Sequence, residues 1–228
     1  MSALHDSRSA QLPRALNAPN SPRLVVRSKT ALRLILAVVM GFAVGAVTEW
    51  SVPHLPFSLE PLANTAAPWV LVACAVALTA RRFGESLLLA VVTLVALVLG
   101  FYVAEAYRGW PVSRHQVEFW IAASVAVGPL VGLAASWLRN AKRTTAALGA
   151  GVIGGLLTGE AVYGLTKLKF STPTHYWYVQ FALGLGLAMG LPLWRSRRQL
   201  LGGLPSLAVS LAACLTIGLG TLVVYQVP

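Results

Sequence analysis

The chain has 228 residues, of which 57% are hydrophobic and only 11% are charged, and its mean hydropathy is +0.70. A water-soluble globule of this size needs many more polar side chains to cover its surface, so the composition excludes a soluble fold. The net charge of +11 would also fit a nucleic-acid-binding protein, and the distribution of that charge has to decide the question.

The N-terminal region differs in composition from the remainder of the chain. Residues 1–29 are rich in Arg and Ser, contain Pro13, Pro19 and Pro22, and show almost no apolar periodicity. Such a segment lacks the apolar surface that would stabilise an ordered structure. We therefore expect a disordered, basic cytoplasmic tail at 1–29, followed by a single transmembrane domain at 30–228.

Seven apolar segments follow the tail, and a membrane-spanning helix needs about 20 mostly apolar residues. The apolar residues do not alternate with polar ones, which excludes a membrane β-barrel and leaves helices as the structure that satisfies its backbone in lipid. The sequence predicts an all-α, polytopic bundle of about seven transmembrane helices. The segments are 34–48, 61–80, 86–104, 119–138, 144–166, 176–194 and 199–228, the last with its helix starting near Pro205.

The cations divide unevenly between the two predicted sides of the membrane. One side holds Arg8, Arg14, Arg23, Arg27, Lys29, Arg33, Arg81, Arg82, Arg139, Lys142, Arg143, Arg195, Arg197 and Arg198; the other holds only Arg108, Arg114, Lys167 and Lys169. By the positive-inside rule the N-terminus lies in the cytoplasm and, after seven crossings, the C-terminus lies outside. The charge thus predicts contact with anionic lipid headgroups at the inner face of the cell membrane, and no nucleic-acid partner.

Two patterns recur along the predicted spans. Small residues stand at every fourth position, as in Gly41 and Gly45 or Gly151 and Gly155, which favours close helix packing within one chain. Three successive pairs of spans also share a Trp near the outer start, a basic inner turn and a Tyr near the outer exit. The second pattern is typical either of a repeated hairpin or simply of membrane topology and its aromatic belts.

Glu160 is the most informative residue, because it lies within the apolar segment 144–166. Counted from Arg143 at about 1.5 Å per residue, it falls roughly 25 Å above the basic plane, just inside the outer edge of a core about 30 Å thick. A carboxylate there is expensive to bury, so we expect it to point into the bundle or toward an outward-open crevice. Tyr163 lies one turn later on the same helical face.

Two further spans also end in an acid, namely Glu49 and Glu105. If the first, third and fifth spans meet, Glu49, Glu105 and Glu160 would border the outer mouth of a cavity, with Arg108 as their counter-ion. The alternative interpretation is that Glu49 and Glu105 are solvated helix ends. These residues, with Tyr163, are the candidate substrate- or ion-binding residues.

Sequence motifs for cofactor chemistry and catalysis are missing. His54, His115 and His175 fall one in each predicted outer segment, but metal ligands usually show tighter spacing, so loop or interface histidines are the favoured interpretation. The chain has no GxxxxGK[ST] or HExxH motif, and its only Asp is Asp6. We predict no metal and no cofactor, and these absences make enzymatic activity the least favoured function.

Several strings resemble a family of small, uncharacterised actinobacterial multi-pass membrane proteins grouped as a domain of unknown function. They are ANTAAPWVLVACAVALTAR (63–81), GFYVAEAYRG (100–109), GPLVGLAASW (128–137) and GEAVYG (159–164). The resemblance covers roughly residues 34–164 and implies a bacterial inner-membrane protein without adding a mechanism.

Three functional hypotheses follow from these observations. The first is transport or binding of a small solute or ion through an outward-facing cavity bordered by Glu160 and the other candidate residues. The second is a non-catalytic accessory or assembly subunit that contacts a partner membrane protein, with Glu160 as a structural hydrogen-bonding residue. A membrane-embedded enzyme is the third and the least favoured.

Overall fold

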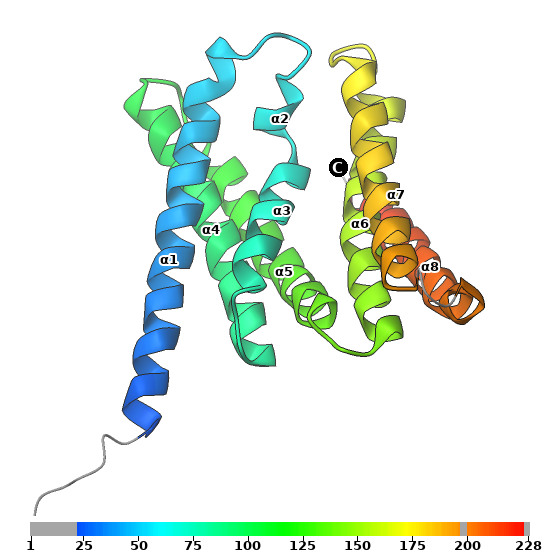
Figure 1. The fold of residues 1–228 in the computed structure, drawn as a ribbon. Coiled ribbons are helices and arrows are strands. Elements are labelled where there is room, and N and C mark those ends of the chain that lie inside the picture. Colours follow the sequence, from blue (N-terminus) through cyan, green and yellow to red (C-terminus); the bar gives the residue numbers. More distant parts are fainter. Residues whose placement is uncertain (1–21, 197–199, 226–228) are drawn as a thin grey trace, which may run out of the picture.

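The computed structural model describes residues 22–196 and 200–225, and every regular element in this part of the chain is helical (Figure 1). The elements are α1 (Pro22–Ser51), η1 (Val52–His54), α2 (Pro61–Asn64), α3 (Ala66–Ala77), α4 (Phe83–Tyr107), α5 (Arg114–Leu138), α6 (Arg143–Lys167), α7 (Thr174–Ser196) and α8 (Leu200–Tyr225).

Six of the described helices, namely α1 and α4 to α8, are long and apolar enough to cross a membrane, which indicates a multi-pass membrane protein. Two boundaries differ from the prediction. Helix α1 begins at Pro22 and so includes residues 22–29 of the predicted tail, while residues 1–21 lie outside the described residues. Helix α8 begins at Leu200 and continues through Pro205, which lies in its second turn and removes only one backbone hydrogen bond there.

The predicted span 61–80 is a broken helix. Thr65 separates α2 from α3 in an extended conformation (φ −118°, ψ 151°). Pro68 explains the break, because in a continuous helix its ring would clash with the carbonyl of Asn64, whereas a proline in the first turn of α3 is tolerated. With 12 residues, α3 is about 18 Å long and too short to cross a membrane alone. The count of seven crossings therefore depends on α2 and α3 together and stays a prediction.

Figure 1 shows how this broken segment is placed among the long helices. Helices α2 and α3 follow one another from the end of the molecule where α1 finishes to the end where α4 begins. Buried side chains of α3, including Ala73 and Cys74, share one hydrophobic cluster with Leu97 of α4, Val131 of α5 and Leu157 of α6. The short helix thus lies at the junction of three long ones.

Two pairs of parallel helices pack in direct backbone contact. Gly45 and Gly100 let α1 and α4 approach until a Cβ on Gly45 would meet the carbonyl of Leu97 and one on Gly100 the carbonyl of Phe42. Gly155 and Gly159 do the same for α6 against α8. Small residues allow such backbone contact, which is how helices associate in lipid.

The parallel pairs divide the described helices into two groups of three, α1, α3 and α4 before α5, and α6, α7 and α8 after it. In each group the first and third helices run parallel in close contact. The predicted hairpins instead joined consecutive spans. A repeated hairpin stays a prediction, and the close contacts of parallel helices join elements that are not consecutive in these groups.

Ion pairs and capping contacts place several predicted inner cations at one end of the molecule. Arg33 of α1 pairs with Glu85 of α4 at 2.8 Å. Arg139 donates to the carbonyl of Leu78 at 3.5 Å, and Arg195 donates to the carbonyl of Leu138 at 3.1 Å. These contacts join α1, α3, α4, α5 and α7 at the end that the charge pattern assigns to the cytoplasm.

The contact between α1 and α4 predicts a large effect for one methyl group. Because a Cβ on Gly45 would overlap the backbone of Leu97, Gly45→Ala should force the helices apart and lower the free energy of unfolding by roughly 1–3 kcal/mol. Gly186→Ala is the matched control, because a Cβ at Gly186 meets nothing within 4 Å. Unfolding of the purified protein in a denaturing detergent measures both variants, and equal stability of the two would contradict this packing.

Candidate functional site

Glu160 binds the start of helix α3. Its side chain, on α6, is almost completely buried, with the residue 5% exposed. Oε1 accepts a hydrogen bond from the backbone N–H of Ala66 at 2.7 Å, and Oε2 accepts one from Ala67 at 2.8 Å. The first N–H groups of a helix have no partner within the helix, and its N-terminus carries partial positive charge. Glu160 therefore supplies from another helix the cap that α3 requires.

Thr65 stands at the position where a side-chain cap is common, but it does not cap α3. Its hydroxyl instead shares a hydrogen bond with the hydroxyl of Tyr176 on α7, at 2.9 Å. This bond holds the linker between α2 and α3 against α7. The start of α3 is consequently fixed to α6 by Glu160 and to α7 by Thr65.

Gln180 of α7 completes the buried network and is itself 4% exposed. Its Nε2 donates to Glu160 Oε2 at 3.0 Å and to the carbonyl of Leu157 at 3.2 Å. Because both partners are acceptors, they fix which end of the amide is the nitrogen. The other end, Oε1, is buried without a hydrogen-bond partner among the described residues.

The opposite end of α3 is also satisfied by side chains of neighbouring helices. Ser86 of α4 donates to the carbonyl of Ala77 at 3.1 Å, and Arg139, just after α5, donates to the carbonyl of Leu78. A cation at the C-terminus and a carboxylate at the N-terminus both complement the helix dipole. Helix α3 is therefore held at its two ends by polar groups of α4, α5, α6 and α7.

A second polar network lies where α1 and α4 end. Arg108 donates to the carboxylate of Glu49 at 2.8 Å and to its backbone carbonyl at 3.1 Å. Glu49 is 6% exposed, so the pair excludes most water. Glu105 lies nearby, and its Oε2 is buried without a hydrogen-bond partner in the part of the chain that the structure describes.

The five candidate residues therefore do not border the opening of a single cavity. Glu49, Glu105 and Arg108 lie between α1 and α4, whereas Glu160 binds α3 and α7, with Tyr163 partly buried one turn later on α6. Arg108 is the counter-ion of Glu49, whereas Glu160 accepts hydrogen bonds from the N–H groups of Ala66 and Ala67 and from the amide of Gln180. Binding of a substrate or ion by any of these residues stays a prediction.

Sequence reasoning missed Thr65, Gln180 and the N–H groups of Ala66 and Ala67. Two signals were available: Pro68 within an apolar run, and Gln180 as the one amide side chain in segment 176–194. Neither signal stands out, because the predicted spans are defined by the absence of charged residues, and Pro68 and Gln180 carry no charge. An uncharged amide or a helix terminus adds no formal charge to a span, and a single glutamine lowers the mean hydropathy of a long apolar segment only slightly.

The predicted outer histidines do not come together in the structure. The described residues contain no group of three or more His, Cys, Asp or Glu side chains that could hold a metal ion. His54 lies instead beside its own helix end, with Nδ1 at 3.1 Å from the carbonyl of Trp50.

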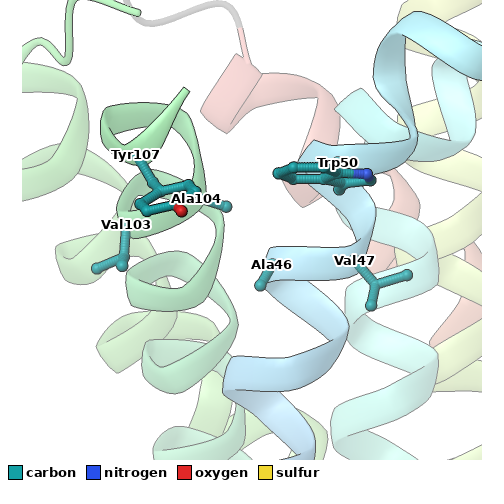
Figure 2. Close-up of a pocket in the computed structure, with 6 residues that line it drawn as sticks. All are labelled: Ala46, Val47, Trp50, Val103, Ala104 and Tyr107. Carbon is teal, nitrogen blue, oxygen red and sulfur yellow. The ribbon is translucent and has the colours of Figure 1, made fainter. Parts of the chain in front are cut away.

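A groove of about 380 Å³ lies between the C-terminal halves of α1 and α4, whose lining side chains Figure 2 draws. Its lining residues are Ala46, Val47, Trp50, Val103, Ala104 and Tyr107. None of the five candidate residues lines it, and its walls are apolar. This groove is thus not the polar cavity that the sequence predicted.

Comparison with known families identifies the chain. A model described as a family of unknown function (DUF6518) matches residues 25–226, and the chain belongs to this family. The match extends well beyond residues 34–164, to which the resemblance carried by the short strings is confined. Comparison with curated proteins and with solved structures finds no match.

The geometry around Glu160 predicts that its amide analogue is a poor replacement. In Glu160→Gln the new NH₂ group would face the N–H of Ala66 or that of Ala67 with the donor of Gln180 nearby, so at least one hydrogen bond is lost. We expect the free energy of unfolding to fall by roughly 1–3 kcal/mol. Melting in detergent measures it.

Glu118→Gln is the control for loss of a carboxylate, because Glu118 is an exposed residue paired with Arg114 one turn away. Its effect should lie within about 0.5 kcal/mol. Equal melting temperatures for Glu160→Gln and the parent would show that the carboxylate does not hold α3.

Proposed function

We propose that this member of the DUF6518 family is a membrane carrier that binds a small solute or ion, and that α3 is the element that moves. The observation that carries the proposal is the polar attachment of a short helix inside the bundle. Glu160, which Gln180 contacts, and the Thr65–Tyr176 pair attach the start of α3 to α6 and α7 through hydrogen bonds.

The position of α3 supports this assignment. The helix lies between α4, from the group that precedes α5, and α6, from the group that follows it. A path across the membrane between these groups would run where α3 now packs. Discontinuous helices at the interface of two helical groups are a recurring device of secondary transporters.

The cost of burying a carboxylate also supports the proposal that α3 is the element that moves. An unbroken helix over residues 61–80 would satisfy its own backbone and need no partner. The chain instead has a proline-induced break and a buried acid that caps the new helix end, which is a costly arrangement in lipid. Such an arrangement is expected where a helix end has to form and lose contacts during function.

In this proposal the network of Glu49, Glu105 and Arg108 has a different task from Glu160. It lies at the outer ends of α1 and α4, where a solute from outside arrives first. The unpartnered Oε2 of Glu105 gives that entrance a hydrogen-bond acceptor. Glu160 and Gln180 lie at the start of α3 and form the inner part of the site.

A second candidate function is a non-catalytic subunit that assembles with a partner membrane protein. The attachment of Glu160 to α3 also favours this function, because it is what a purely structural acid would show. Helix α1 has the least buried of the six candidate spans and offers an apolar face to a partner helix. Transport of a solute across a membrane by the purified chain distinguishes the two functions, because only the carrier function requires it.

The proposal includes an orientation in the cell membrane. The end that holds Arg33, Arg139 and Arg195 faces the cytoplasm and its anionic headgroups, and the C-terminus lies outside. A reporter active only in the cytoplasm should give no signal when it is fused after Val227. A strong signal from that fusion would replace seven crossings by an even number.

Uptake into proteoliposomes tests the carrier function. The purified chain is reconstituted and assayed by counterflow with labelled Na⁺, glycine, glycolate, acetate and glucose. We expect uptake of at least one of these probes, with a large loss in Glu160→Leu because α3 then lacks its cap. Glu118→Gln should transport like the parent, since its side chain is exposed.

Two controls separate lost transport from lost protein. The Glu160→Leu variant is compared only after gel filtration and melting show how much folded protein remains, and uptake is expressed per folded molecule. If the parent moves none of the probes, while it co-purifies stoichiometrically with one other membrane protein, the carrier function fails and the subunit function replaces it.

A further inference from the structure

The N-terminus of α3 has the features of a carboxylate-binding site. Two successive N–H groups, those of Ala66 and Ala67, each donate to a different oxygen of one planar carboxylate at 2.7 and 2.8 Å. Helix N-termini favour anions, through these unpaired donors and through the helix dipole. In this structure the chain's own Glu160 occupies the site.

Gln180 provides an independent indication of a ligand. The residue is 4% exposed, and its amide nitrogen contacts the same Glu160 oxygen that accepts from Ala67. Its Oε1 is bonded to the same amide carbon as that nitrogen and so belongs to the same buried network, and it has no hydrogen-bond partner in the described part of the chain. A buried acceptor without a donor is unfavourable, so this oxygen marks a place for an N–H or O–H group.

Opening of the bundle imposes a condition on this site. If α3 moves away from α6, Glu160 leaves the N–H groups of Ala66 and Ala67. Unpaired backbone groups within lipid are costly, so α3 moves readily only when another acceptor takes the place of Glu160. A ligand carboxylate is the acceptor whose shape matches the two donors.

We infer that the solute of this carrier is a small molecule with a carboxylate and an adjacent N–H or O–H donor. Its carboxylate replaces Glu160 at the start of α3, and its donor group binds Gln180 Oε1. This inference rests on the proposed carrier function and assigns the substrate class. Binding of the ligand is then coupled to the release of α3 from Glu160. The coupling arises because the ligand binds the displaced state of α3 better than the state in which Glu160 caps the helix.

Chemical rescue tests the anion site without any transport assay. Glu160→Ala removes the internal carboxylate and leaves the N–H groups of Ala66 and Ala67 without their acceptor. We expect its melting temperature in detergent to fall, and to be recovered by sodium acetate but not by acetamide or sodium chloride at equal concentration. Rescue by acetamide and acetate alike, or by neither, would overturn the anion site.

Gln180 is tested in the chain that keeps Glu160, so the test does not depend on folding of the alanine variant. Glycolate and glycine should raise the melting temperature of the parent more than acetate does, and Gln180→Leu should abolish this preference. If the preference persists in Gln180→Leu, or if the parent does not distinguish these ligands from acetamide, Gln180 Oε1 binds only an internal water and the substrate class is wrong.

The two proposals fail in different ways. Rescue by acetate keeps the anion site, and the carrier function is removed if the parent also takes up none of the probes and co-purifies stoichiometrically with one other membrane protein. Uptake of Na⁺ or glucose with no carboxylate rescue keeps the carrier function and removes this substrate class.

Discussion

The structure depends on one requirement of the backbone in lipid, namely that the first N–H groups of a helix must find acceptors. Pro68 forces a new helix to begin at Ala66, within the bundle, and so creates donors that the helix itself cannot satisfy. Glu160 on α6 accepts hydrogen bonds from these donors, and Gln180 on α7 donates a hydrogen bond that fixes the carboxylate. One proline thereby determines the polar groups that two other helices must carry.

Helix α6 can reach α3 with its acid because glycines let its other neighbours approach closely. Gly149 lies against the backbone of α5, Gly151 against that of α8, and Gly154 against that of α7. Its span is 78% buried, the highest of the six candidate spans, whereas that of α1 is 17% buried. The glycines of α6 thus do more than allow close helix packing. They bring α7 close enough for Gln180 to contact the carboxylate of Glu160.

Much of this arrangement could be predicted from sequence, and the part that could not has a physical reason. Apolar length located the six long helices, and the charge of Glu160 within segment 144–166 marked it as a buried acid. Helix pairing was not predictable, because glycine stripes on several spans permit close contact without naming the partner. The first and third spans do meet, but the fifth packs against the seventh, which separates Glu160 from Glu49 and Glu105.

The two polar networks differ in the mobility that they permit. Helices α1 and α4 are joined by an ion pair at each end, Arg33–Glu85 and Glu49–Arg108, and by interlocked glycine contacts between them. Separating them would break both ion pairs and leave the buried carboxylates of Glu49 and Glu85 without their counter-ions, which is strongly unfavourable. Helix α3 is held at its start by hydrogen bonds to side chains, and those acceptors can be exchanged.

The same comparison shows which helix must move if the bundle opens. Helix α6 cannot follow α3, because its glycines fix it against the backbones of α5, α7 and α8 at once. Glu160 therefore stays with α6 while the N–H groups of Ala66 and Ala67 leave with α3. Any opening that involves α3 separates the carboxylate from these donors, so the availability of a replacement acceptor controls the motion. In the proposed carrier, the conformational equilibrium of the bundle is then set by the chemistry of a single helix end.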